Sequence, residues 1–366
     1  MSIYLDHAAT TPVDERVIET MITCMRESFA NPSAAYSAAG AARRAQRLAR
    51  QTVGRMLGCD QSAVFFTSGG TESNNWAMQA AGGRHAVVSA IEHASVLEAA
   101  KAFAGSVTLV QPDENGVILP ETVEKAIRPD TALVSVQWAN NETGVLQPVE
   151  KIARIAHAHG ALFHTDAVQA FGHVPVHVEN IDLLSLSAHK FYGPRGAGCL
   201  YVKPGTRLPA LLYGGGQESG LRAGTENTPA ICGLGVAAEL AEKDMDERAE
   251  RERALLDLFV QELRGLPVRV LGAKADRLPG VMALLIPGHE SEGLIAKLDV
   301  QGIQVSGGAA CAAGSGESSH VYRAMGLSDR EARCVIRISV GRMNTPDDMQ
   351  KAAQALIACV RPAGMI

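Results

Sequence analysis

The chain has 366 residues, of which 46% are hydrophobic and 20% charged, a composition typical of a globular protein with a buried core. Its 34 basic and 39 acidic residues leave a net charge of −5, so the charge balance gives no support for general nucleic-acid binding. Seven cysteines, odd in number and without CxxC spacing, argue against a disulfide framework or a zinc site, and the lack of an apolar signal or membrane-spanning run predicts a soluble, cytoplasmic protein.

Short apolar runs alternate with helical patterns through the first two thirds of the chain. The runs that we interpret as buried strands are AVFFT (63–67), AVVSA (86–90), VTLV (107–110), ALVSVQW (132–138), ALFHT (161–165) and DLLSLS (182–187). Helical spacing lies between several of them, as at 121–127 and 149–160. This alternation predicts an α/β protein with a mostly parallel sheet covered by helices on both faces. The run at 197–202 follows 182–187 closely and is predicted to pair with it as an antiparallel edge.

The pattern changes from about residue 229. The next segment, to residue 265, predicts one long helix or two in series, with a dense charge run at 242–253. It is followed by a strand (281–286), a helix (291–299), a Gly/Ala/Ser loop (306–316), a strand (334–340) and a helix from Pro346. We therefore predict a large domain at 13–250 and a smaller α+β domain formed by 1–12 and 251–366.

Polar side chains follow three of the predicted strands. Asp166 directly follows one strand, and His189 and Lys190 follow the next. The turn at 68–71, Ser-Gly-Gly-Thr, follows the first strand and opens a helix, whose free N–H groups suit a phosphate. Taken singly, the turn and Asp166 are equally explained as helix caps, and Lys190 as a surface lysine. Together, a phosphate site, an acid and a lysine at one edge of a sheet are the set that a pyridoxal 5′-phosphate (PLP) enzyme needs.

Longer motifs extend this interpretation along nearly the whole chain. They are YLDHAATTP (4–12), FTSGGTESNN (66–75), IEHASV (91–96), ANNETGVLQP (139–148), FHTDAVQA (163–170), DLLSLSAHKFYGPRGAG (182–198) and GGGQESGLRAGTEN (214–227). In this order they resemble the NifS/IscS-type cysteine desulfurases, which are PLP-dependent enzymes of the aminotransferase class V family. The resemblance implies the aspartate aminotransferase-like fold, fold type I, with a large sheet of the seven-stranded type and a smaller α+β domain.

The resemblance also implies roles at the cofactor. Lys190 would carry the Schiff base, Asp166 would pair with the pyridine nitrogen, and His93 would stack on the ring. Gln169 would hydrogen-bond the ring hydroxyl. The residues implied to hold the phosphate are Gly70, Thr71, Ser187 and His189.

Further roles concern the substrate and a second subunit. Asn141 would lie near the ring hydroxyl and the substrate, and Arg342 would bind the substrate carboxylate, for which the planar guanidinium is suited. Thr225 would reach the phosphate from the neighbouring subunit, so the resemblance implies a homodimer.

Cys311 stands apart from the other cysteines because it lies in a glycine-rich run, SGGAACAAGSGESSH (306–320). Such a run is a poor place for a packing residue, whereas the other six cysteines are interpreted as small buried hydrophobes. The resemblance implies that the Cys311 thiolate takes the sulfur of L-cysteine, leaving L-alanine and a persulfide. The persulfide would pass to an acceptor in iron–sulfur cluster assembly or tRNA thiolation. Ala309 and Ala310 before the cysteine, and Tyr36 where a histidine is usual, depart from the family pattern.

Two other functions remain open at this point. A transaminase, or another lyase resembling selenocysteine lyase, would use the same cofactor site, although a transaminase needs no thiol at Cys311. A non-catalytic relative of the same fold would have no need of both Lys190 and Asp166. A nucleotide-binding Rossmann protein is disfavoured, because no GxGxxG follows the first strand.

Overall fold

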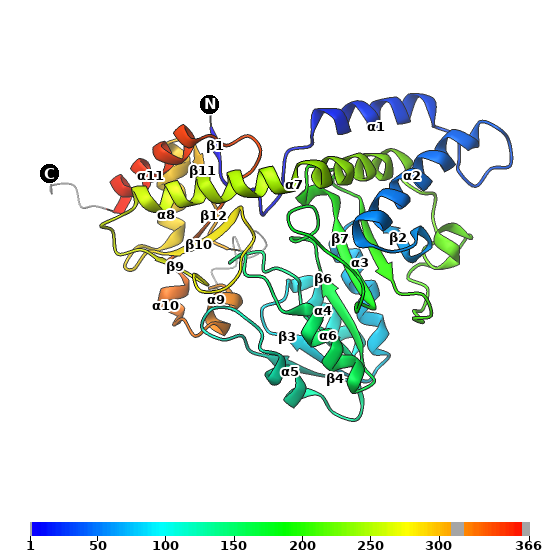
Figure 1. Ribbon diagram of the computed structural model, residues 1–366, viewed down its shortest axis with the longest axis horizontal. Helices are drawn as coiled ribbons and strands as arrows, with labels where there is room; N and C mark the ends of the chain where they lie inside the picture. The colour runs from blue at the N-terminus through cyan, green and yellow to red at the C-terminus, as the bar shows by residue number, and fades with distance from the viewer. Residues whose placement is uncertain (1, 309–317, 361–366) are drawn as a thin grey trace.

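The computed structural model describes residues 2–308 and 318–360, and its larger part is built on a seven-stranded sheet (Figure 1). The strand order is β2-β8-β7-β6-β5-β3-β4. The strands are β2 (Val64–Thr67), β3 (His85–Ser89), β4 (Ser106–Val110), β5 (Thr131–Ser135), β6 (Leu162–Asp166), β7 (Leu183–Ser187) and β8 (Gly198–Val202). Strand β8 pairs antiparallel with both neighbours, and the other pairs are parallel. This is the mostly parallel sheet that the apolar runs predict.

The structure differs from the sequence-based prediction in the position of β8. The strand does pair antiparallel with β7, but its other side is covered by β2, so it is not an edge strand. All five of its residues are buried, as expected for a strand with neighbours on both sides and helices on both faces.

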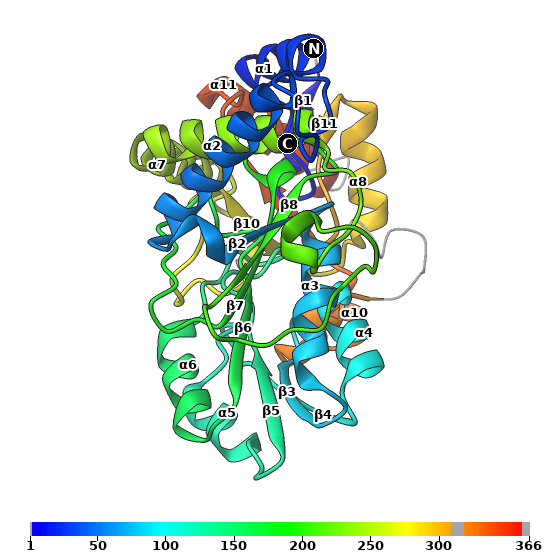
Figure 2. The same ribbon diagram turned by 90° about the vertical axis from the view of Figure 1, so that its right-hand side faces the viewer.

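Helices cover both faces of the sheet. Successive side chains of a strand point to opposite faces, so a strand of mostly apolar residues contributes to a hydrophobic core on each side. In β3, Val87 belongs to one hydrophobic core and Val88 to another. Figure 2 shows α3 and α4 on one side of the strands and α5 and α6 on the other. The helices of this part are α1 (Glu15–Glu27), α2 (Ala39–Leu57), α3 (Gly70–Met78), α4 (Ala94–Phe103), α5 (Pro120–Ala126) and α6 (Val149–Ala158).

A single helix of 35 residues, α7 (Thr228–Glu262), joins the two parts of the molecule (Figure 1). Near its start it packs on α1 and α2, and its later turns pack on α11 (Pro346–Val360). Ala241 lies in the core beside the large sheet, and Leu255 lies in the smaller core. The predicted domain boundary after residue 250 falls between these two contacts and stays a prediction.

The smaller part contains a three-stranded antiparallel sheet in the order β12-β10-β9, which consists of β12 (Val335–Ser339), β10 (Val281–Leu285) and β9 (Arg269–Val270). The N-terminal strand β1 (Ile3–Tyr4) pairs in parallel with β11 (Ile303–Gln304). The N-terminus therefore packs with the C-terminal third of the chain, and Leu5 is part of its core. The helices of this part are α8 (Ser291–Val300), α9 (His320–Ala324), α10 (Asp329–Ala332) and α11. Among the residues described, no helix is long and apolar enough to cross a membrane.

Candidate active site

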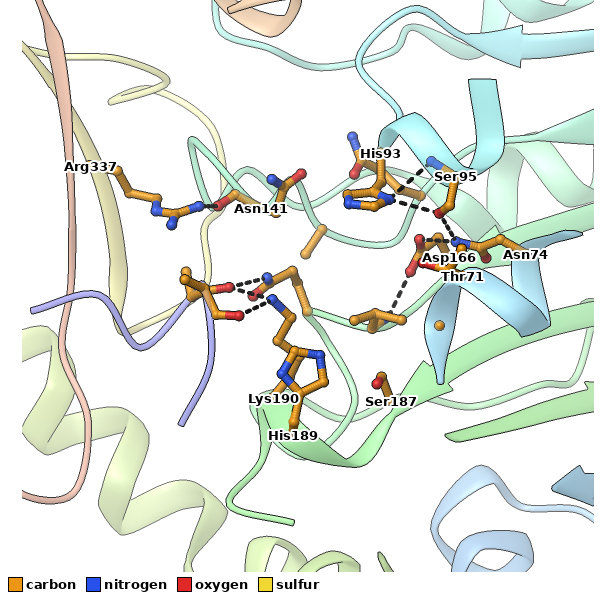
Figure 3. A pocket seen from close by; sticks show the side chains of 17 residues that line it. Thr71, Asn74, His93, Ser95, Asn141, Asp166, Ser187, His189, Lys190 and Arg337 are labelled. Atoms are coloured by element: carbon orange, nitrogen blue, oxygen red, sulfur yellow. Dashed lines mark hydrogen bonds between the residues drawn. The ribbon is translucent and has the colours of Figure 1, made fainter. Parts of the chain in front are cut away.

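A cavity of about 250 Å³ lies beyond the carboxyl ends of β6 and β7 (Figure 3). Ligands of parallel α/β sheets bind at this edge, beyond the strand ends. Its walls come from distant parts of the chain, because Ala8 and Ala9 follow β1 and Arg337 belongs to β12. The cavity therefore lies where the two parts of the molecule meet.

The structure brings most of the predicted site residues to this one cavity. Those that line it are Gly70, Thr71, His93, Asn141, Asp166, Gln169, Ser187, His189 and Lys190. Their positions in the sequence span more than a hundred residues, so only the fold brings them together.

Asp166, at the end of β6, is held by two hydrogen bonds. Its Oδ1 accepts from the backbone N–H of Val168 at 2.9 Å, and its Oδ2 accepts from the side-chain amide of Asn74 at 2.6 Å. Asn74 lies on α3 and donates also to Ser95 Oγ at 2.9 Å, so α3 and α4 together orient the carboxylate. No role was predicted for Asn74 from the sequence, although it lies within the motif at 66–75.

The start of α3 forms a cradle at one end of the cavity. Residues 70 and 71 open the helix, where N–H groups have no intrahelical acceptor and the helix dipole favours an anion. A Cβ at position 70 would lie 2.7 Å from Val168 Cγ2, so any larger residue there would force Val168 or the helix start to shift. Ser187 and His189 also lie on the cavity wall, and Ser187 is next to this turn. The arrangement suits a phosphate group.

Lys190 follows β7 in a short 3-10 helix, Ala188–Lys190. Its Nζ donates to the backbone carbonyls of Ala8 at 2.7 Å and Ala9 at 2.8 Å, as Figure 3 shows. The N-terminal segment after β1 therefore orients the amine at the cavity.

Two histidines of the cavity are neutral near pH 7. Nδ1 of His93 accepts the N–H of Ser95 at 3.1 Å, which places the ring proton of the neutral form on Nε2. Burial lowers the pKa of His93, and the Lys190 charge acts in the same direction, against the charge of Asp166. Burial also lowers the pKa of His189 to about 4, assisted by the charges of Lys190 and Arg195. Neutral rings can stack on an aromatic group without adding positive charge to the cavity.

The structure corrects the prediction for the substrate-binding arginine, because Arg342 does not line this cavity. Its guanidinium donates to Asp244 Oδ2 and Asp14 Oδ2, both at 2.9 Å, and stacks over the Tyr192 ring. These contacts fasten the start of α1 to α7.

The arginine of the cavity is Arg337, whose side chain is 1% exposed. Its Nη1 donates to the carbonyl of Asn141 at 2.8 Å, and its Nη2 donates to Asp6 Oδ1 at 2.6 Å. Its buried Nε has no hydrogen-bond partner among the residues that the structure describes. An arginine held in this way has a donor left for an anionic ligand.

Besides Arg342, two predicted residues are not among those described at the cavity. Thr225 lines a separate hollow of about 220 Å³, together with Ser68, Gly196 and Arg222. Cys311 lies outside the described residues.

Comparison with known proteins gives the family. A family model described as aminotransferase class-V matches residues 3–351. The chain belongs to this family. It is 41% identical to the cysteine desulfurase IscS of Methanosarcina thermophila, over 97% of this chain and 91% of the relative. It is 42% identical to the putative cysteine desulfurase IscS 1 of Bacillus subtilis, over 98% of each chain.

Solved structures of the family are also similar. A NifS-like protein from Rickettsia africae has a TM-score of 0.91 and 31% identity, over 98% of this chain and 99% of that one. A structure described as SspA in complex with cysteine has a TM-score of 0.81 and 36% identity, over 93% and 99%. The predicted family and fold class are confirmed.

Class-V enzymes of this kind depend on PLP, and the residues of the cavity fit that group. The start of α3, with Gly70 in close contact with its neighbours, suits a phosphate. The carboxylate of Asp166, oriented by two hydrogen bonds, suits a protonated pyridine nitrogen, and Lys190 supplies an amine. The cavity thus contains donors and acceptors for each part of the cofactor.

Proposed function

We propose that this chain is a PLP-dependent cysteine desulfurase, which converts L-cysteine to L-alanine and leaves the sulfur as a persulfide on Cys311. The observation that carries the proposal is the meeting of Lys190, Asp166 and Arg337 in one cavity of a chain similar to cysteine desulfurases over nearly its full length. The reaction balances without an outside oxidant: L-cysteine and one thiol give L-alanine and one persulfide. The C–S bond of the substrate breaks, and an S–S bond to Cys311 forms.

The residues around Lys190 would bind the cofactor and move protons. When bound, PLP supplies an electron sink for the substrate α-carbon. Lys190 Nζ would hold the cofactor and take the α-proton, with the carbonyls of residues 8 and 9 keeping the amine in place. Asp166 would keep the pyridine nitrogen protonated, and the neutral ring of His93 would lie against the cofactor ring.

The remaining cavity residues would fix the phosphate and the ring hydroxyl. Gly70 and Thr71 would bind the phosphate through the start of α3, with the Ser187 hydroxyl and His189 beside them. Gln169 and Asn141 would lie near the ring hydroxyl; the amide of Gln169 is oriented by its 2.8 Å hydrogen bond to the carbonyl of Ala8.

The cysteines support Cys311 as the nucleophile. None of the six cysteines that the structure describes lines the cavity. Burial raises the pKa of Cys59 to about 11 and that of Cys232 to about 12, so these two stay protonated and unreactive. Cys311, in its glycine-rich run, is the remaining thiol.

Arg337 is proposed to bind the substrate carboxylate in place of Arg342. We expect Arg337→Lys to raise KM for L-cysteine about 10- to 100-fold, because an ammonium cannot reproduce the planar guanidinium fork. The absorbance of the bound cofactor should be unchanged. Arg342→Lys is the matched control and should leave KM unaltered, since its partners are Asp14 and Asp244. Steady-state kinetics of both variants test the assignment, and a raised KM in the control alone would contradict it.

A homodimer, with Thr225 reaching the phosphate of the partner, is part of the proposal. Thr225 lies away from the cavity of its own chain. Tyr213 is 88% exposed and Phe29 is 81% exposed, and in the proposed dimer a second copy would cover such large apolar side chains. Sedimentation of the holoenzyme should give twice the mass of one chain; a monomer at micromolar concentration would refute this part.

The experiment that tests the function is incubation of the holoenzyme with L-cysteine and dithiothreitol, with alanine and sulfide measured together. A desulfurase gives both in equal amounts. A transaminase consumes a 2-oxo acid and releases no sulfide, and a non-catalytic relative gives neither product. The persulfide would then pass to an acceptor protein, in iron–sulfur cluster assembly or in tRNA thiolation.

A further inference from the structure

Glu142 is a buried carboxyl that the roles above do not use. It lies in the turn between β5 and α6 and is only 1% exposed. The side chain of Asn140 fixes this turn, because its Oδ1 accepts the N–H groups of Glu142 and Thr143, both at 2.9 Å. These two hydrogen bonds therefore fix the backbone that carries the Glu142 side chain.

The carboxyl of Glu142 touches both ends of the segment that carries Cys311. After that segment, the hydroxyl of Ser319 donates to Glu142 Oε2 at 2.6 Å. Before it, the backbone of Gly308 passes so close that a Cβ there would lie 2.7 Å from the same oxygen. Gly308 also has φ +137°, which favours glycine. One oxygen atom thus lies against the last described residue before the segment and close to the first described residues after it.

The same turn and the same segment end are attached to the cavity arginine. The carbonyl of Asn141 accepts from Arg337 Nη1, and the backbones of Ser306 and Arg337 exchange two hydrogen bonds. Ser306 Oγ then donates to the carbonyl of Gly308 at 2.9 Å. Arg337, Glu142 and Gly308 are thereby linked through fixed contacts.

The charges around Glu142 come from two elements packed against the turn. Burial raises its pKa, whereas the Ser319 hydroxyl and the charges of His320 on α9 and Arg337 on β12 lower it. Burying a carboxyl at this place carries a desolvation penalty that an apolar side chain of similar size would not have. What Glu142 gains is the hydrogen bond from Ser319 and the attraction of these two positive charges.

We propose that Glu142 is a positioning residue for the thiol step, holding the two ends of the Cys311 segment beside the arginine that binds the substrate. The inference rests on the proposed function, since it takes Cys311 as the nucleophile. Attack on the substrate sulfur needs the two sulfur atoms in line and close together, and a displacement of about 1 Å can cost about 100-fold in rate. Steps that need no thiol do not depend on this contact.

The test compares two substrates in the holoenzyme. L-Cysteine requires the thiol, whereas 3-chloro-L-alanine loses chloride without thiol attack and uses the same amine and arginine. In Glu142→Gln and Ser319→Ala, we expect kcat for sulfide release from L-cysteine to fall about 10- to 100-fold. The initial rate of chloride release, and KM for L-cysteine, should stay within about twofold.

Ser319 also caps α9, so the matched control is Ser328→Ala, which removes the capping serine of α10 without touching Glu142. It should leave both reactions unchanged. An equal loss in both reactions, or no loss in either, would overturn the inference. If Glu142→Gln does not accumulate as folded protein, Ser319→Ala, at a half-buried site, tests the same hydrogen bond. Wild-type protein that releases chloride but no sulfide would instead disprove the desulfurase function itself.

Discussion

Replacing Lys190 by alanine is expected to remove covalent attachment of the cofactor and to lower turnover of L-cysteine by about 10³-fold or more. The amine is oriented by two backbone carbonyls, at 2.7 and 2.8 Å, and no shorter side chain can reach the same point. Borohydride reduction of the wild-type holoenzyme, followed by peptide mass spectrometry, should fix the cofactor on the peptide that contains residue 190. In Lys190→Ala this product and the visible absorbance should both be absent.

Lys203→Ala provides the matched control for this experiment. Lys203 pairs with Asp182 at 3.3 Å, and its side chain is 42% exposed at the surface. Its replacement should leave cofactor attachment and turnover unaltered. Cofactor fixed elsewhere in the chain, or turnover that survives in Lys190→Ala, would refute the assignment of Lys190.

The large sheet was predictable because most of its strands are buried on both faces. In Leu183–Ser187, for example, three leucines are interspersed with small serines and all five residues are buried, which distinguishes the run from exposed segments. The central position of β8 was not predictable. The strand that covers its other edge is β2 (Val64–Thr67), which lies far from β8 in the sequence, and no local pattern indicates such a pairing. Whether α7 is one helix or two was ambiguous from the sequence, because the dense charge run obscures the apolar positions that pack on α11.

The arginine of the site shows where motif comparison falls short of strand geometry. In β12 the side chains of Ile336 and Ile338 lie in the smaller core, so Arg337 and Ser339 point to the opposite face. That face meets the cavity, where Ser339 Oγ accepts the N–H of Ala8 at 2.9 Å. Arg342 lies beyond the strand end and is taken up by two carboxylates. Strict alternation in β12 was thus the sequence signal by which Arg337 could have been identified.

Asn74 was missed for a different reason. An asparagine within a helix is usually explained by solvent exposure, and its partner Asp166 is distant in sequence. The hydrogen bond exists only because α3 crosses the end of β6, which is a property of the tertiary fold. Side chains that act through hydrogen bonds to another group, as Asn74 does on Asp166, therefore escape a search for reactive residue types.

Cys311→Ser should lower sulfide release from L-cysteine by about 10³-fold or more, because a serine hydroxyl at neutral pH is a far weaker nucleophile than a thiolate. The absorbance of the bound cofactor, and chloride release from 3-chloro-L-alanine, should persist, since Lys190, Asp166 and Arg337 are untouched. Cys359→Ser, at a partly buried cysteine on α11, is the control and should behave as wild type. Mass spectrometry of the wild-type protein after L-cysteine should show an added sulfur atom on the peptide with residue 311. If sulfide release survives in Cys311→Ser, or the added sulfur lies on another cysteine, the sulfur does not pass through Cys311.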